Sequence, residues 1–140
     1  DGRWFGSALH NNAGAVTGTT NQYVASGTYS PTFAGVTNVT GTPTINGTWK
    51  WIRVGNVVTV SGSVSVDPTA TGFTVWTATL PIASNFTTVG DANGVVGTDT
   101  NTEAGGSIIA QIATDDVVMF FDSSTTTAHN ATTHFTYEVK

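Results

Sequence analysis

Cysteine is absent from the sequence, which excludes disulfide bonds, cysteine metal ligands and thiol nucleophiles. The 140-residue chain must therefore hold its fold by packing alone or by association with other subunits. Charge is also scarce, because 9% of the residues are charged, against about 25% in an average globular domain. Lysine and arginine together number four, too few for a stripe that neutralises phosphates, so we expect no nucleic-acid partner.

Long apolar runs are missing too. No run approaches the roughly 18 residues that a membrane-spanning helix needs, so we expect no membrane insertion. Nothing resembles a signal peptide. The chain begins at Asp1 without a methionine, which favours a processed product or a C-terminal piece of a longer protein.

What the sequence has in place of charge is threonine, which occurs 28 times, together with 16 glycines and much serine, valine and asparagine. This composition is typical of strands and tight turns. No stretch keeps a helical period for three turns, so helices should be minor. Short strands at near-regular spacing predict an all-β fold, an antiparallel, jelly-roll-like β-sandwich. The expected strands are 27–34, 36–45, 48–54, 57–66, 73–80, 89–98, 106–114, 117–123 and 132–139.

Two regions are expected along the chain. Residues 1–26 carry Gly, Asn and Thr clusters between small apolar patches, which favours an extended N-terminal linker or stalk that packs on something else. Residues 27–140 contain all the expected strands and form the sandwich domain.

The stretch Trp51–Ala70 alternates valines on one face with Thr and Ser on the other. A two-residue primed turn at Gly55-Asn56 joins it to the preceding strand and fixes the register between the two. Both tryptophans of that strand then lie on the valine face, and Trp49 covers the gap left by a glycine. The predicted pairs are Val54 with Val57, Arg53 with Val58, Trp51 with Val60 and Trp49 with Gly62.

The strands around 108–112 and 117–121 are apolar on both faces. One small antiparallel domain does not easily cover both faces of such strands. Either a loop covers a central strand or a second chain does, and the second chain is the favoured interpretation.

The sequence gives little indication of catalytic or metal-binding side chains. Asp115-Asp116 is interpreted as a hairpin turn, and Asp99–Glu103 as a polar loop more than as a calcium loop, since the glycine and twelve-residue frame are missing. His10, His129 and His134 are expected on the surface without a metal. No nucleophile elbow or nucleotide-binding glycine motif is present, so we expect no enzyme and no cofactor.

Trp76 has two interpretations. Its neighbours Phe73 and Val75 belong to the opposite strand face, so Trp76 is either an exposed platform for a sugar ring or a buried core residue. The four Asn-x-Ser/Thr triplets, at Asn38, Asn46, Asn85 and Asn130, are attributed to composition.

Five stretches together resemble a domain at the C-terminal end of the virion fibres of tailed phages, found on tail fibres, tail spikes and head fibres. The resemblance covers essentially the whole chain and is most specific at RVGNVVTVSGSVSVDP (53–68). It implies a jelly-roll-like sandwich, a homotrimer and a position at a fibre tip that contacts a bacterial surface. The stretches are LHNN (9–12), GTTNQYVASGTYSPT (18–32), WIRVGNVVTVSGSVSVDPTA (51–70), LPIASNF (80–86) and HFTYEVK (134–140).

The resemblance therefore predicts an extracellular virion protein that forms a homotrimer. Its other expected partners are an upstream fibre shaft and a host cell-surface glycan or protein. The alternatives are a purely structural head-fibre or trimerisation cap, and part of a polysaccharide depolymerase, although no carboxylate pair for glycoside hydrolysis is indicated. Recognition is expected in the loops within 89–116 and 123–133. The candidate receptor contacts are Trp76, Asp99, Asn101, His129 and Asn130.

Overall fold

The computed structural model describes residues 24–98 and 105–140, which form one curled antiparallel sheet of ten strands. The all-β prediction is confirmed, and the only helix within these two ranges is the single 3-10 turn η1. The elements are β1 (Val24–Tyr29), β2 (Phe33–Thr37), β3 (Thr44–Ile45), β4 (Trp49–Val54), β5 (Val57–Val66), β6 (Gly72–Ala78), η1 (Val89–Asp91), β7 (Ala92–Thr98), β8 (Gly106–Gln111), β9 (Asp116–Ser123) and β10 (His129–Glu138).

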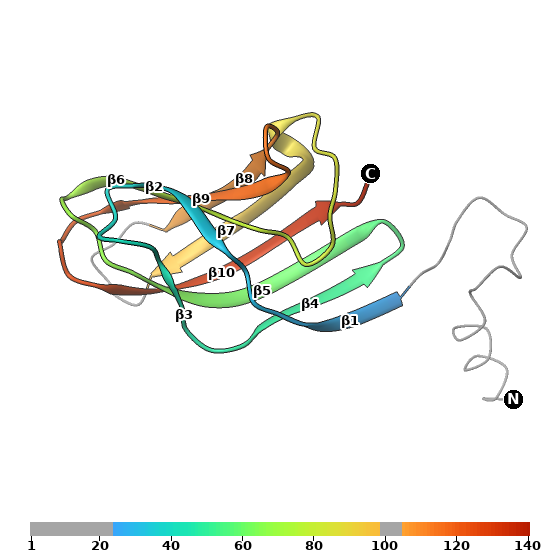
Figure 1. Cartoon of the computed structure of the whole chain (residues 1–140), viewed down its shortest axis with the longest axis horizontal. Helices are drawn as coiled ribbons and strands as arrows, with labels where there is room; N and C mark the ends of the chain where they lie inside the picture. Colours follow the sequence, from blue (N-terminus) through green and yellow to red (C-terminus); the bar gives the residue numbers. More distant parts are fainter. Residues whose placement is uncertain (1–23, 99–104) are drawn as a thin grey trace, which may run out of the picture.

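The strand order explains why the sheet curls. It runs β1-β4-β5-β10-β7-β8-β9-β6-β2, with the short β3 paired to β5. The two edge strands, β1 and β2, are consecutive in the chain and are separated only by residues 30–32. A sheet whose opposite edges are joined by so short a link must bend until those edges come together at the link (Figure 1). The pairs β5–β10, β6–β9 and β7–β8 are nested one inside the next.

The core lies inside the curl and follows the predicted alternation. Val58, Val60, Val64 and Val66 are all buried on the inner face of β5. The predicted hairpin register is confirmed, since Val54 pairs with Val57 and Trp51 with Val60. Gly55 has φ 62, as a primed turn requires at its first central position.

The stretch 36–45 was expected to be one strand, and this prediction is wrong. The chain leaves the sheet after Thr37 because Asn38 and Gly41 adopt the left-handed conformation, with φ 57 and 67. It returns only for the two residues of β3. At the N-terminal side β1 begins at Val24, before the expected first strand, and the rest of the expected N-terminal segment lies outside the described residues.

The elongated domain has two different ends. Val24 and Glu138 flank the hairpin of β4 and β5, so β1 begins and β10 finishes at one end, which we call the proximal end (Figure 1). Residues 79–91 and 112–115 also lie there. Among the described residues, the opposite, distal end is formed by the connections 38–43, 67–71 and 124–128.

Candidate functional site

Trp76 is buried, which decides between the two interpretations of this residue. Its side chain is 0% exposed on the inner face of β6 and contacts Phe121 edge-on, with the ring centroids 6.0 Å apart. A side chain without exposed surface offers nothing to a ligand, so Trp76 leaves the set of candidate receptor contacts. The outward residue of this strand is Phe73, which is 56% exposed.

His129 is also buried, so the expectation that it lies on the surface is wrong. The imidazole is 1% exposed, packs edge-on against Phe121 and lies 3.2 Å, through Nε2, from the hydroxyl of Thr125. β10 begins three residues earlier than expected, and its inward alternation of Phe135, Thr133 and Ala131 therefore continues to His129. His134 does lie on the outer face, as predicted.

Asn130 is the one candidate contact that the structure shows to be exposed. Its Oδ1 accepts a hydrogen bond of 2.8 Å from Nδ2 of Asn46, which follows β3. Asp99 and Asn101 lie outside the described residues. The structure thus keeps one predicted contact at the distal end and brings it beside a loop that the sequence had not singled out.

The distal loops are fixed by side-chain hydrogen bonds. Asn38 donates through Nδ2 to the carbonyl of Ala70 and to Oγ1 of Thr74, at 2.8 and 2.9 Å. Its Oδ1 accepts from the hydroxyl of Thr69 and from the amide of Ala70, both at 2.8 Å. These four bonds join the loop after β2 to the loop before β6 and to β6 itself, so this surface is organised in the absence of a ligand.

The distal loops are almost without charge. Asp67 is the only charged residue in the segments 38–43, 67–71 and 124–128, which otherwise carry mainly Thr, Ser, Asn, Pro and Gly. Hydroxyl and amide groups both donate and accept hydrogen bonds. Such a surface is chemically matched to a neutral, hydroxyl-bearing ligand.

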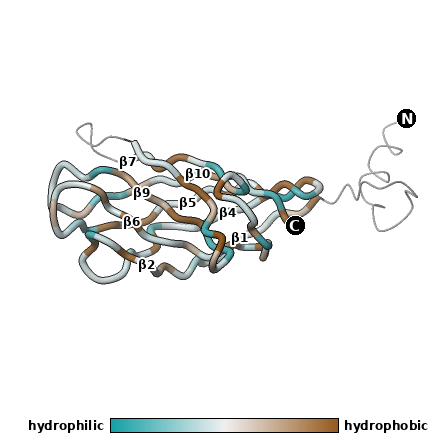
Figure 2. The backbone as a smooth tube through the Cα atoms, turned by 90° about the horizontal axis from the view of Figure 1, so that it is seen from above, coloured by the Kyte–Doolittle hydropathy of each residue, from teal (hydrophilic) through white to brown (hydrophobic). Residues whose placement is uncertain are grey.

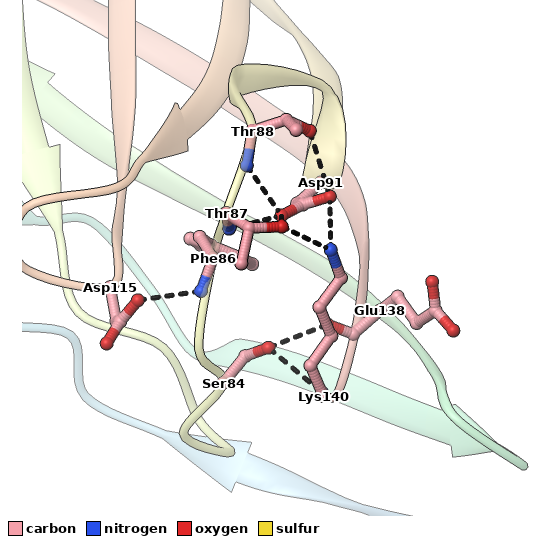
Figure 3. A network of polar contacts seen from close by, with 8 residues as sticks. All are labelled: Ser84, Phe86, Thr87, Thr88, Asp91, Asp115, Glu138 and Lys140. Atoms are coloured by element: carbon pink, nitrogen blue, oxygen red, sulfur yellow. Dashed lines mark hydrogen bonds and ion pairs between the residues drawn. The ribbon is translucent and has the colours of Figure 1, made fainter.

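The proximal end holds a polar cluster around Asp91 (Figure 3). Its carboxylate accepts hydrogen bonds from the amides of Thr87 and Thr88, at 2.6 and 3.0 Å, and forms an ion pair of 2.7 Å with Lys140. The hydrogen bond from Lys140, followed by those from the two amides, holds the pKa of Asp91 well below its usual range. All of these partners lie within the protein, so the cluster fastens the segment 79–91 to the end of β10.

Three further contacts fasten the same segment. The hydroxyl of Tyr137 donates to the carbonyl of Ile82 at 2.8 Å, and burial raises the pKa of Tyr137 to about 12. Ser84 donates to the carbonyl of Glu138 at 2.7 Å. Oδ1 of Asp115, in the predicted turn between β8 and β9, accepts from the amide of Phe86 at 2.7 Å. The cluster is therefore a structural clamp.

Exposed aliphatic side chains gather at the proximal end. Val24, Val54 and Val57 form one row across β1, β4 and β5, and they are 56%, 57% and 46% exposed. Ile52, 46% exposed, lies in the next row of the same outer face. In Figure 2 the tip beside the C-terminus carries hydrophobic segments, whereas the loops at the opposite end are mainly white or teal. We call these four residues the proximal patch.

The strands that were expected to be apolar on both faces do point Ile109, Val118 and Phe120 outward, and all three are partly exposed. They cover one another across β8 and β9, and Phe120 also packs against Phe73. This face leaves less apolar surface open than the sequence suggested. That a second chain covers the outer face of these strands remains a prediction.

The described residues contain neither a metal-binding cluster nor a membrane-spanning helix. In 24–98 and 105–140 no group of three or more His, Asp or Glu side chains is placed to hold a metal ion. Within the same ranges, no helix has the length and apolar character needed to cross a bilayer. Comparison with protein-family models, with curated proteins and with solved structures gave no match.

Proposed function

We propose that this chain is the tip domain of a tailed-phage virion fibre, which associates as a homotrimer at its proximal end and binds a host cell-surface receptor, a glycan, at its distal end. The proposal rests on the sequence resemblance and on one structural observation, the difference between the two ends. The proximal end, where β1 begins, carries exposed aliphatic side chains. The described loops of the distal end are organised and polar, and Asp67 is their only charged residue.

The fold supports the same proposal. We interpret the curled sheet as a jelly-roll-like β-sandwich, because the nested pairs β5–β10, β6–β9 and β7–β8 follow the pattern of a long hairpin wrapped round a core. Loops carried on such a rigid framework are the usual place for recognition.

Association is tested by light scattering on the full 140-residue chain. We expect a trimer at micromolar concentration, and the double variant Val54→Ser with Val57→Ser should shift it toward monomer, because apolar area removed from water drives association. Val95→Ser is the matched control, since Val95 is 61% exposed on β7, away from the proximal patch. A monomeric wild type, or equal loss of association in both variants, would contradict this part of the proposal.

Receptor binding is tested by adsorption of the labelled chain to a panel of bacterial strains. Binding should be strain-specific and should fall when the distal segment 124–128 is replaced by glycine and serine. The turn 112–114 belongs to the range 89–116 in which recognition was expected from the sequence, but it lies at the proximal end, so its replacement should have no effect. A trimer that adsorbs to no strain would instead support the structural cap.

A further inference from the structure

The outer face of β6 and β9 presents an exposed aromatic ring at the distal end. Phe73 is the second residue of β6 and is 56% exposed. Its ring packs against that of Phe120 on β9, with the centroids 5.3 Å apart and the planes inclined by 48°. The two rings therefore form one fixed platform, open on the solvent side.

A carboxylate lies beside this platform. Asp122 is directly opposite Phe73 in the register of β6 and β9, and directly opposed residues have Cβ atoms about 5 Å apart. Asp122 is exposed, and no lysine or arginine in the described part of the chain forms an ion pair with it. Among the described residues, nothing therefore prevents its oxygens from accepting hydrogen bonds from a ligand.

The approach to the ring is open. The side chain of Phe73 is 56% exposed, and Gly72 just before it is the first residue of β6. Its partner in the register is Ser123, the last residue of β9. The platform thus borders the distal loops 67–71 and 124–128.

We infer that Phe73 and Asp122 form a subsite for one neutral pyranose ring of a bacterial surface glycan. One face of such a sugar carries C–H groups that pack on the negative face of an aromatic ring. Its hydroxyl groups donate to a carboxylate at the ring's edge. The inference rests on the proposed function and adds to it one specific contact with the glycan.

The chemistry argues against other occupants. An anionic sugar would meet the negative charge of Asp122. A cationic side chain would gain little here, because both the ring and the carboxylate are exposed, and cation–π contacts and ion pairs at exposed sites are weak. A flat, uncharged ring with hydroxyl groups satisfies both the aromatic surface and the carboxylate.

The test measures binding of the full chain to an array of bacterial surface polysaccharides, followed by calorimetric titration of a bound one. Phe73→Ala should weaken binding about tenfold, equivalent to about 1.4 kcal/mol. Phe73→Leu, which keeps apolar area but loses the flat face, should fall between Phe73→Ala and wild type, and Asp122→Asn should weaken binding several-fold. Val95→Ala is the control, because it removes another exposed apolar side chain of the outer face and should leave binding unchanged.

Each contrary result overturns the inference in a recognisable way. If Phe73→Ala binds glycans like wild type, the glycan lies elsewhere and the proposed function survives. If the chain adsorbs to bacteria but to no glycan, the receptor is a protein. If Phe73→Ala lowers the mass in light scattering, a second copy covers the platform. If neither cells nor glycans are bound, the proposed receptor function fails together with the inference.

Discussion

Trp49 can occupy the centre of the core because the residue opposite it on β5 has no side chain. A Cβ built on Gly62 would lie 2.1 Å from the indole of Trp49, which is 0% exposed. The indole Nε1 donates to the carbonyl of Ser63 at 2.9 Å, so the ring is held by a hydrogen bond as well as by packing. The ring therefore cannot shift without losing both.

Gly62→Ala should accordingly lower the free energy of unfolding by about 1–3 kcal/mol, the range of an overpacked core. Gly90→Ala is the control, because a Cβ there meets its nearest atom at 3.9 Å, and this change should stay within about 0.5 kcal/mol of wild type. Urea denaturation monitored by tryptophan fluorescence measures both. Equal midpoints for the two variants would contradict the packing argument.

Single residues also show which contacts could be predicted from the sequence and which could not. The pairing of Trp49 with Gly62 followed from the turn at Gly55, because a hairpin register is set by its turn. The burial of His129 was missed because the start of β10 was placed three residues late, in a run of Thr, Ala and Asn without a strand signal. Had the inner alternation been continued from Phe135, it would have reached His129.

Among the elements, the segment 79–91 depends most on side-chain bonds. It contains no strand, and the cluster around Asp91 ties it to Lys140. Because the pKa of Asp91 is lowered in the folded state, its contribution to stability is present above the unfolded value of about 4 and is lost as the pH falls below that value.

We therefore expect the wild-type unfolding temperature to fall between pH 5 and pH 2, and Asp91→Asn to reduce that fall while lowering stability at pH 7. Lys140→Met removes the partner that lowers the pKa of Asp91 most, so it should also reduce the fall of the unfolding temperature at acid pH. Thermal unfolding followed by circular dichroism across this pH range gives the three curves. Parallel curves for wild type and Asp91→Asn would exclude the clamp as a source of acid sensitivity.

The strands differ in how well their limits could be predicted. β5 begins and ends where its valine alternation does, and Asp67-Pro68 stops it because proline cannot donate to a ladder. β2 and β3 were merged, since the break between them depends on the left-handed conformation of Asn38. Four hydrogen bonds to distant residues stabilise that conformation, and local sequence does not reveal them.

For the whole molecule, the scarcity of charge has a measurable consequence. A receptor bound through neutral hydroxyl and amide groups gains little from long-range electrostatics, so added salt has little to screen. Adsorption to a bound strain should change less than about threefold between 0.05 and 0.5 M NaCl, in contrast to the steep loss that multiple ion pairs would give. A tenfold loss over this range would show that charge carries the interaction.

The antiparallel, all-β character of the molecule followed from composition and spacing, but the strand order did not. Local pattern gives hairpins such as β4–β5, whereas β10 lies between β5 and β7 because of pairings that span much of the chain. Thr133 and Gly62, for example, are 71 residues apart and share a hydrogen bond. The alternation of apolar and polar residues shows which face of a strand is buried, but it does not show which strand lies beside it.

The central place of β10 has a consequence for biosynthesis. β10 joins β1, β3, β4 and β5 to the remaining strands through ten pairs with β5 and seven with β7. A ribosome that adds about 5–20 residues per second exposes β5 several seconds before β10. During that interval β5 has an open edge, which is prone to pair with other chains. The serine and threonine that alternate along β5 make one face of this nascent strand hydrophilic, which favours its solubility until β10 is synthesised.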